Sequence, residues 1–259
     1  MRKKIRFNTI SLGSEPDQPD IDELIPFIRT MRDQEADLIS FYLARSLELQ
    51  LEAGITSPGA GGRFMQSRFQ DAIICSSDGY QTNLQSFATD ARMMTLTAGP
   101  VRSILPGPGL IPGSPDPEDE EQYADYSDAY TEILRTMRDN FISGHLLHVL
   151  DVCPIDEERI ASQKTTFVVP DGNIDVQSRI LEFQSRIALT SNRTGLLDEL
   201  MDQYDIRTLF LIDPDEKGYK KALEHLDPEQ ITLGGYACGS EDQYWKDVAG
   251  AATTTISQG

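Results

Sequence analysis

The second half of the chain alternates short apolar runs with segments in which apolar positions recur every three or four residues. Apolar runs rich in leucine and β-branched residues predict buried strands, and the wider spacing predicts amphipathic helices. The predicted strands cover residues 146–150, 165–169, 188–190, 206–212 and 231–233. The predicted helices cover residues 123–141, 155–162, 174–187, 194–203, 217–226 and 241–248.

The first half follows the same pattern less regularly. Residues 5–12 and 72–75 predict strands, and residues 26–51 and 81–93 predict helices. The glycine cluster at 58–62 lacks the lysine and the spacing of a phosphate-binding loop and is interpreted as a flexible loop. Strands that alternate with helices of about ten residues indicate a parallel sheet. We therefore expect an α/β fold with a largely parallel sheet covered by helices on both faces.

A proline- and glycine-rich segment at residues 105–117 interrupts this pattern and runs into the acidic residues 118–121. Its proline density excludes a helix or a central strand. The segment is interpreted as an interdomain linker or arm, with a long functional loop as the alternative. It divides the chain into an N-terminal α/β region (1–104) and a C-terminal α/β region (118–259), although a single combined domain is also open.

Composition narrows the class of protein. The chain has 259 residues, 39% of them hydrophobic, which is typical of a globular protein, and a net charge of -19. This acidity disfavours nucleic acid as a partner, because phosphate groups are bound by clustered lysine and arginine. No apolar stretch approaches the length of a membrane span, so we expect no membrane association. Three scattered cysteines and no apolar leader segment favour a cytoplasmic protein.

Aspartates follow several predicted strands. In an open parallel sheet, ligands bind beyond the carboxyl ends of the strands, so these positions are the first candidates for chemistry. They are Asp78, Asp151, Asp171, Asp213 and Asp215. Converging carboxylates would recruit a divalent cation such as Mg²⁺. The alternative is that aspartate is simply favoured where strands turn.

The segment 209–223 resembles the metal-binding segment of Toprim domains, in which a hydrophobic strand leads into Asp-x-Asp, a glycine and a helix. The resemblance extends over about residues 165–250. It implies that Asp213 and Asp215 hold Mg²⁺ and that Asp171 moves the proton in phosphodiester or phosphoryl-transfer chemistry. Asp171 stands where that family has a glutamate.

The same resemblance makes Lys217, Lys220 and Lys221 candidate phosphate-binding residues, although the solvated face of a surface helix explains them equally well. Two other functions stay open. One is a non-catalytic assembly subunit or adaptor that binds other proteins, or its own copies, through the arm and the acidic surface. The other is an enzyme of nucleotide or sugar-phosphate type.

The histidines and cysteines give weaker signals. His145 and His148 are three residues apart in a predicted strand and point to opposite faces, so structural roles are favoured. Cys153, beside Asp151, is a possible nucleophile, but no histidine is placed by the sequence to activate it. A small buried thiol is the favoured interpretation.

Overall fold

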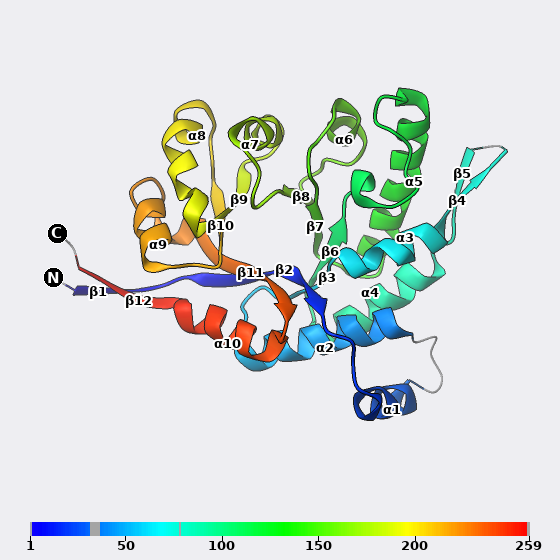
Figure 1. Ribbon diagram of the computed structural model, residues 1–259, viewed down its shortest axis with the longest axis horizontal. Helices are drawn as coiled ribbons and strands as arrows, with labels where there is room; N and C mark the ends of the chain where they lie inside the picture. Colours follow the sequence, from blue (N-terminus) through cyan, green and yellow to red (C-terminus); the bar gives the residue numbers. More distant parts are fainter. Residues whose placement is uncertain (1, 32–36, 78, 258–259) are drawn as a thin grey trace.

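A computed structural model describes residues 2–31, 37–77 and 79–257 (Figure 1). Two four-stranded parallel sheets form its centre. One has the order β2–β11–β10–β9 and the other β3–β6–β7–β8. Their strands are β2 (Asn8–Pro16), β3 (Gly59–Gly61), β6 (Arg102–Pro106), β7 (Gly144–His148), β8 (Thr165–Val168), β9 (Arg186–Thr190), β10 (Thr208–Ile212) and β11 (Ile231–Gly239).

The two sheets meet at both edges. At the first seam, a parallel bridge joins Ile10 of β2 to Ser57, which precedes β3. At the second seam, between β8 and β9, two glutamine side chains connect the backbones. Gln184 donates to the carbonyl oxygens of Phe167 and Arg186, at 3.0 and 2.6 Å, and accepts from the Phe167 amide.

Gln177 spans the same seam closer to the carboxyl ends of the strands. Its amide nitrogen donates to the carbonyl oxygens of Val169 and Ala188, at 2.6 and 3.4 Å. The eight strands thus follow one another around a closed ring in chain order. This arrangement is a (β/α)₈, or TIM, barrel.

Side chains that point inward fill the middle of the barrel. They form one buried apolar cluster, made of Ile10, Leu12, Ile104, Leu146, Val168, Ala188, Phe210 and Ile212. Alternate residues on the same strands face outward into separate clusters beneath the helices. The parallel α/β architecture is therefore confirmed. The expectation of helices on both faces is corrected, because in a closed barrel the strands cover their own inner face.

The helices lie outside the barrel. They are α1 (Ile21–Thr30), α2 (Leu38–Ala53), α3 (Gln66–Ala72), α4 (Gln85–Ala98), α5 (Glu120–Asp139), α6 (Pro154–Arg159), α7 (Ile174–Leu181), α8 (Leu197–Gln203), α9 (Glu216–Ala222) and α10 (Glu241–Ala251). Short 3₁₀ helices are η1 (Arg63–Met65), η2 (Pro108–Leu110), η3 (Ser191–Leu196) and η4 (Pro228–Gln230). None of the helices in the described ranges is long and apolar enough to cross a membrane.

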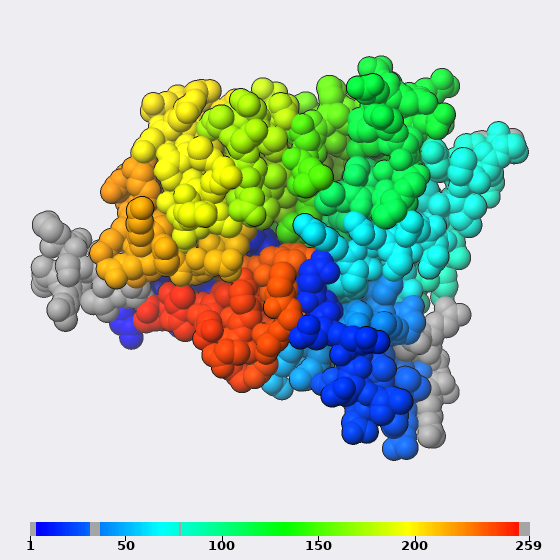
Figure 2. Space-filling model, viewed as in Figure 1, coloured from blue at the N-terminus to red at the C-terminus, as the bar shows by residue number. Residues whose placement is uncertain are grey.

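The ends of the chain are joined outside the barrel. Strand β1 (Arg2–Arg6) pairs antiparallel with β12 (Thr253–Ser257). Helix α10 packs beside α2 and β2, so segments from opposite ends of the chain lie side by side in Figure 2. The fully buried Trp245 of α10 fills this contact, against Leu49 and Ile55. The first and last elements of the described chain therefore pack against each other and against the outside of the barrel.

Several predicted elements differ from the structure. The predicted strand at 72–75 lies in a hairpin of β4 (Ile73–Ser76) and β5 (Gly79–Thr82), outside the barrel. The barrel uses β3 and β6 instead, which fall in or beside segments interpreted as loops. The predicted helix at 174–187 ends at Leu181, and β9 begins at Arg186. A strand made of glycine and alanine has no hydrophobic period, so β3 could not be recognised in isolation.

Candidate functional site

The residues that follow the carboxyl ends of the strands come together on one face of the barrel, where barrel enzymes carry their active sites. The predicted metal residues Asp213 and Asp215 follow β10 at this face. Asp215 is the N-cap of α9, and its Oδ1 accepts a hydrogen bond of 2.6 Å from the Gly218 amide. Gly218 packs against Ser191, with no room for a Cβ atom. A helix cap and a close contact therefore explain the Asp-x-Asp-x-x-Gly pattern.

Asp213 is held differently from Asp215. It adopts a φ of 46°, which is uncommon for a residue other than glycine. Its Oδ1 accepts a hydrogen bond of 2.6 Å from the Tyr244 hydroxyl, and its carbonyl oxygen accepts one from Ser191. The structure thus gives each aspartate of the pair its own protein partner.

Asp171 lies in the connection after β8, and the three candidate lysines lie on α9. Asp171, which follows β8, accepts a hydrogen bond of 3.4 Å from the Thr190 hydroxyl. On α9, Lys220 pairs with Glu216, and Lys221 pairs with both Asp198 and Glu224, so these two lysines have carboxylate partners. Lys217 is exposed on the same helix.

Asp78 lies outside the described residues. Among the residues that the structure describes, no group of three or more His, Cys, Asp or Glu side chains is arranged to hold a metal ion. The aspartates around the barrel end therefore do not converge as a metal cluster in the described part of the chain.

The inner rim of this face carries a histidine, a tyrosine and a glutamate. His148, on β7, and Tyr236, on β11, contact each other edge to face with ring centroids 5.1 Å apart. The Tyr236 hydroxyl donates to Glu15 at 2.7 Å. His148 Nε2 lies 2.7 Å from the Leu12 carbonyl oxygen and must carry the proton of that bond. Burial lowers the pKa of His148, so the imidazole is neutral, with Nδ1 as its acceptor.

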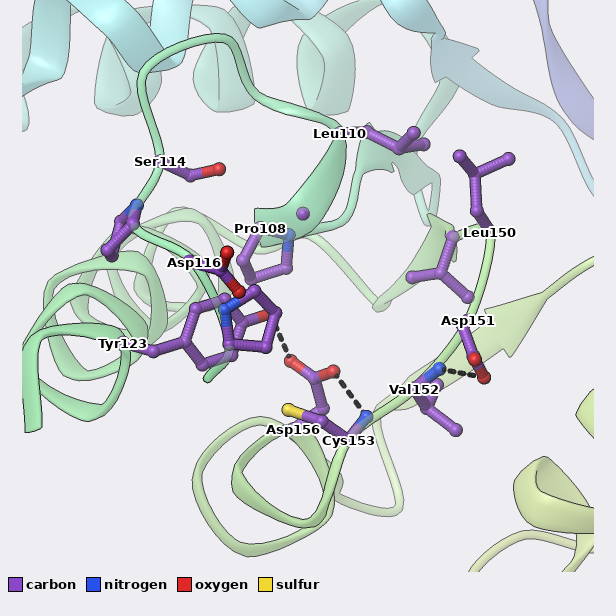
Figure 3. A pocket seen from close by; sticks show the side chains of 14 residues that line it. Pro108, Leu110, Ser114, Asp116, Tyr123, Leu150, Asp151, Val152, Cys153 and Asp156 are labelled. Carbon is purple, nitrogen blue, oxygen red and sulfur yellow. Dashed lines mark hydrogen bonds between the residues drawn. The ribbon is translucent and has the colours of Figure 1, made fainter. Parts of the chain in front are cut away.

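A pocket of ≈ 540 Å³ opens beside this rim, between the connections that follow β6 and β7 (Figure 3). Its first wall is the proline- and glycine-rich segment, through Pro108, Leu110 and Pro117. Its second wall is the segment from Val149 to Cys153, and Tyr123 of α5 and Asp156 of α6 line the bottom. Apolar side chains thus face a smaller group of polar ones.

Asp156 is a buried carboxylate in this pocket, and two hydrogen bonds hold it. It is 4% exposed, and its Oδ1 accepts a hydrogen bond of 2.9 Å from the Tyr123 hydroxyl. Its Oδ2 accepts one of 3.0 Å from the Cys153 amide. Burial raises the pKa of Asp156, and the donated hydrogen bonds offset only part of that effect. The result is a carboxyl group whose affinity for a proton is higher than that of an exposed aspartate.

Cys153 and Tyr123 stay protonated beside this carboxylate. Burial raises the pKa of the Cys153 thiol, and the neighbouring Asp156 raises it further. The same two causes raise the pKa of Tyr123 well above its ordinary value. A protonated thiol is a poor nucleophile, so the arrangement favours proton transfer over attack by sulfur.

The charges in the lining all have one sign. Asp116, Asp151 and Asp156 are its ionisable carboxylates, and none of the described residues that line the pocket is lysine, arginine or histidine. Asp151 is paired from outside the pocket with Arg179, which donates to both carboxylate oxygens at 2.6 and 2.7 Å. The pocket therefore suits a cationic or neutral ligand and disfavours an anion.

The sequence predicts roles for two residues of this site, but it does not predict that they lie together. Tyr123 is predicted as a core residue of an amphipathic helix, and Cys153 is predicted as a small buried thiol. Asp156 gives no signal of its own, because an acid at the third position of a helix is an ordinary cap. Only the packing of α5 against α6 brings the Tyr123 hydroxyl to it.

No family model matches the chain, and no curated protein matches it. Solved structures do match. A B12-independent methionine synthase from Shewanella sp. W3-18-1, in complex with selenomethionine, is 14% identical. The match covers 95% of this chain and 96% of that one, with a TM-score of 0.59. This likeness shows the fold, an α/β barrel.

Two more structures match with lower scores. A putative dihydrodipicolinate synthase family protein from Coccidioides immitis is 10% identical over 89% of this chain and 67% of that one, with a TM-score of 0.46. A putative dihydrodipicolinate synthetase from Pseudomonas aeruginosa has the same identity and TM-score over 95% and 77% of the two chains.

These findings correct the resemblance to Toprim domains over residues 165–250, which is wrong. The strand, aspartate and helix that suggested it are one βα unit of the barrel, and Asp215 serves as the helix cap. The expectation of Mg²⁺-dependent phosphoryl transfer or phosphodiester processing is wrong with it. The two other functions, an acidic assembly subunit and a nucleotide or sugar-phosphate enzyme, fit these neighbours no better.

Proposed function

We propose that this chain is a barrel enzyme that binds a small amine with an apolar body in the pocket between the β6 and β7 connections, and that Asp156 exchanges a proton with that amine. The observation that carries the proposal is the lining of the pocket, which combines an apolar wall with a buried carboxyl group. None of the described residues that line the pocket has a cationic side chain. A ligand that matches it has a cationic head and an apolar body.

The apolar body has an identifiable place. Leu110 and Leu150 lie on the side of the pocket opposite Asp156 (Figure 3), and Leu150 is 72% exposed. A ligand that covers this side chain removes apolar surface from water, which contributes about 25 cal/mol per Å². The proline-rich segment 105–117 then acts as a wall of the binding site, which is the functional-loop interpretation of that segment.

The cationic head has a partner in Asp156. An ammonium group that donates a hydrogen bond to this carboxylate gains a charge-assisted interaction in a water-poor position. Because burial raises the pKa of Asp156, the carboxylate is a better proton acceptor than an exposed aspartate. Transfer of one proton from the ammonium nitrogen to Asp156 leaves a neutral amine and a neutral carboxyl group, so no net charge is created.

One of the solved neighbours suggests which ligands to test first. That methionine synthase holds selenomethionine, an amine with an apolar side chain and an α-carboxylate. For this chain the carboxylate is the unfavourable part, because the pocket offers it no cation. We therefore expect binding to decrease in the order 3-methylthiopropylamine, L-methionine, 4-methylthiobutyrate, which differ only in their charged ends.

Thermal melting with each of the three ligands at equal concentration and ionic strength tests the proposal. A ligand at one hundred times its Kd stabilises the native state by about 2.7 kcal/mol. We expect the amine to raise Tm, L-methionine to raise it less, and the butyrate to leave it unchanged. Asp156→Asn is expected to abolish the shift, whereas Asp205→Asn, an exposed aspartate paired with Arg207, is expected to retain it.

A second readout does not depend on the folding of a variant. Cys153 lines the pocket, whereas Cys75 lies exposed on the β4–β5 hairpin. Bound amine is expected to slow the alkylation of Cys153 by iodoacetamide and to leave Cys75 unaffected, as followed by peptide mass spectrometry. A butyrate that binds as well as the amine, or an amine that does not protect Cys153, would contradict the proposal.

A further inference from the structure

The opposite end of the barrel lumen, at the amino-terminal ends of the strands, carries two arginines. Arg102 of β6 lies two residues before Ile104, and Arg186 of β9 lies two residues before Ala188. Ile104 and Ala188 belong to the cluster that fills the barrel. Because side chains alternate along a strand, both arginines share the inward face. We call this end of the lumen the floor.

Threonines surround the arginines at the same level. Each of three strands carries a threonine two residues before an inward-facing position, so these side chains also face inward. They are Thr166 on β8, Thr208 on β10 and Thr232 on β11. The register places Thr208 beside Arg186. Arg186 Nη1 donates to the Thr166 hydroxyl oxygen at 3.1 Å, and Thr166 is 1% exposed. The floor is thus a ring of hydroxyl and guanidinium groups. It lies beneath the buried apolar cluster that fills the barrel, which we call the apolar plug.

Neither arginine forms an ion pair with any residue in the part of the chain that the structure describes. Burial lowers the pKa of Arg102, and the charge of Arg186 lowers it further. Two like charges held together at a partly dry site destabilise the fold unless an anion joins them. This absence is unexpected in a chain with 42 acidic side chains.

The floor is accessible from the surface. A groove of ≈ 570 Å³ lies at its edge, between the segments that precede β8 and β9. Arg186 lines this groove together with Lys164, which is exposed. Among the described residues that line this groove, Lys164 and Arg186 are the cations, and Glu157 is the carboxylate.

We propose that the floor of the barrel binds a small tetrahedral oxyanion, either free phosphate or the terminal phosphate of a larger molecule. Arg102 and Arg186 bind its oxygens through their planar N–H forks. The threonine hydroxyls donate to the oxygens that remain. Lys164 attracts the anion at the groove. This site lies at the end of the lumen opposite the amine pocket and is independent of it.

The test uses inorganic phosphate as the probe. Wild-type Tm is measured as phosphate replaces chloride at constant ionic strength and pH, so that general screening is held fixed. A saturable rise in Tm is expected for the wild type. The rise is expected to disappear in Arg102→Gln and in Arg186→Gln. It is expected to persist in Arg207→Gln, because Arg207 is exposed and paired with Asp205.

Two further variants and one further ligand complete the design. Arg186→Lys keeps the charge and removes the fork, and it is expected to weaken the phosphate effect several-fold without abolishing it. Phenyl phosphate separates the two sources of the anion: it raises Tm if the site accepts a terminal phosphate and leaves Tm unchanged if the site encloses free phosphate. Because the wild-type titration needs no variant, the test stands even if Arg102→Gln fails to fold.

Two results would overturn the proposal. One is a wild-type Tm that does not respond to phosphate beyond the response to chloride. The other is a phosphate response that is equal in Arg102→Gln, Arg186→Gln and the wild type, which would mean that phosphate acts elsewhere on the surface.

Discussion

The two ends of the barrel lumen are built from the same strands and carry opposite chemistry. At the carboxyl-terminal end the polar groups are a neutral histidine, a phenol and a carboxylate: His148, Tyr236 and Glu15. At the floor they are the guanidinium groups of Arg102 and Arg186, among threonines. Strand β9 shows the change over five residues, from Arg186 through the buried Ala188 to Thr190. The apolar plug keeps the two ends separate.

This difference changes what the net charge means. A charge of -19 describes the sum over the chain and disfavours anions as ligands in general. The floor nevertheless places two cations together. At the other end, the charged side chains among the described residues that line the pocket are all carboxylates. A ligand responds to the field at its own site, so an acidic protein can bind an amine at one end and an oxyanion at the other.

The largest expected effect tests how tightly the carboxyl-terminal end is closed. Gly61 of β3 has a φ of +122°, and a Cβ there would overlap the Ile104 carbonyl oxygen. Gly61→Ala is therefore expected to lower the free energy of unfolding by about 4 kcal/mol, from a strained backbone and overpacking together. A Cβ at Gly59, at the floor end of the same strand, would meet Ile104 Cδ1 at 2.8 Å and the Arg102 carbonyl oxygen at 3.2 Å, so Gly59→Ala is expected to cost less, about 1 kcal/mol.

Urea denaturation of the two variants measures this contrast. Equal losses for Gly61→Ala and Gly59→Ala would show that β3 is equally crowded at both ends. A Gly61→Ala variant as stable as the wild type would show that the approach of β3 to β6 can relax.

The next largest expected effect is a difference in unfolding free energy between alanine substitutions of the two glutamines at the seam between β8 and β9. Gln177 is 1% exposed, so Gln177→Ala leaves the buried carbonyl oxygens of Val169 and Ala188 without the side-chain donor they have in the wild type. We expect a loss of about 3 kcal/mol. Gln184 lines the groove at the floor, where water can enter. Gln184→Ala is expected to cost about 1 kcal/mol.

Denaturation of these two variants also bears on the anion site. If Gln184→Ala costs as much as Gln177→Ala, water does not reach the seam at the floor. In that case the route proposed for the oxyanion is closed.

The smallest effect concerns pH. The folded pKa of Asp156 lies above the ordinary value, so protonation favours the native state. The stability from this group is fully present below the unfolded pKa and is lost as pH rises through the folded pKa. Relative to Asp156→Asn, the wild type is therefore expected to lose on the order of 1 kcal/mol as the pH rises from acid to neutral.

Denaturant titrations of wild type and Asp156→Asn across that pH range measure the difference. Asp205→Asn, at the floor end of the molecule, serves as the control and is expected to follow the wild-type curve. A constant difference between wild type and Asp156→Asn would mean that the carboxyl group does not titrate with a raised pKa.

Prediction from sequence was strongest for the βα units of the second half of the chain. Strand β10 and helices α9 and α10 have hydrophobic periods of their own, and their expected positions agree with the structure to within a few residues. Strand β3 has no such period, because it is defined by its close approach to Ile104. Strand β6 was missed because its last residues belong to the proline-rich segment.

The candidate site was predictable as a region but not as a set of residues. Acids after strand ends were expected to carry chemistry, and Asp171, Asp213 and Asp215 do lie at that face. Their roles in catalysis and Mg²⁺ binding stay predictions, and the described residues form no group of three or more ligands that could hold a metal ion. Two groups of the pocket whose pKa values are raised, Asp156 and Tyr123, come instead from two helices and meet only by packing. Binding to other proteins or to its own copies also stays a prediction.

By itself, the sequence determined the local elements and the α/β class, because hydrophobic period, helix caps and strand propensity act over a few residues. Only the tertiary structure decided that the sheet closes. Closure depends on contacts between segments far apart in the chain, such as Ile10 with Ser57 and Gln184 with Phe167. Closure in turn decided which alternate side chains face inward. It therefore placed two arginines at one end of the lumen and a histidine and a tyrosine at the other.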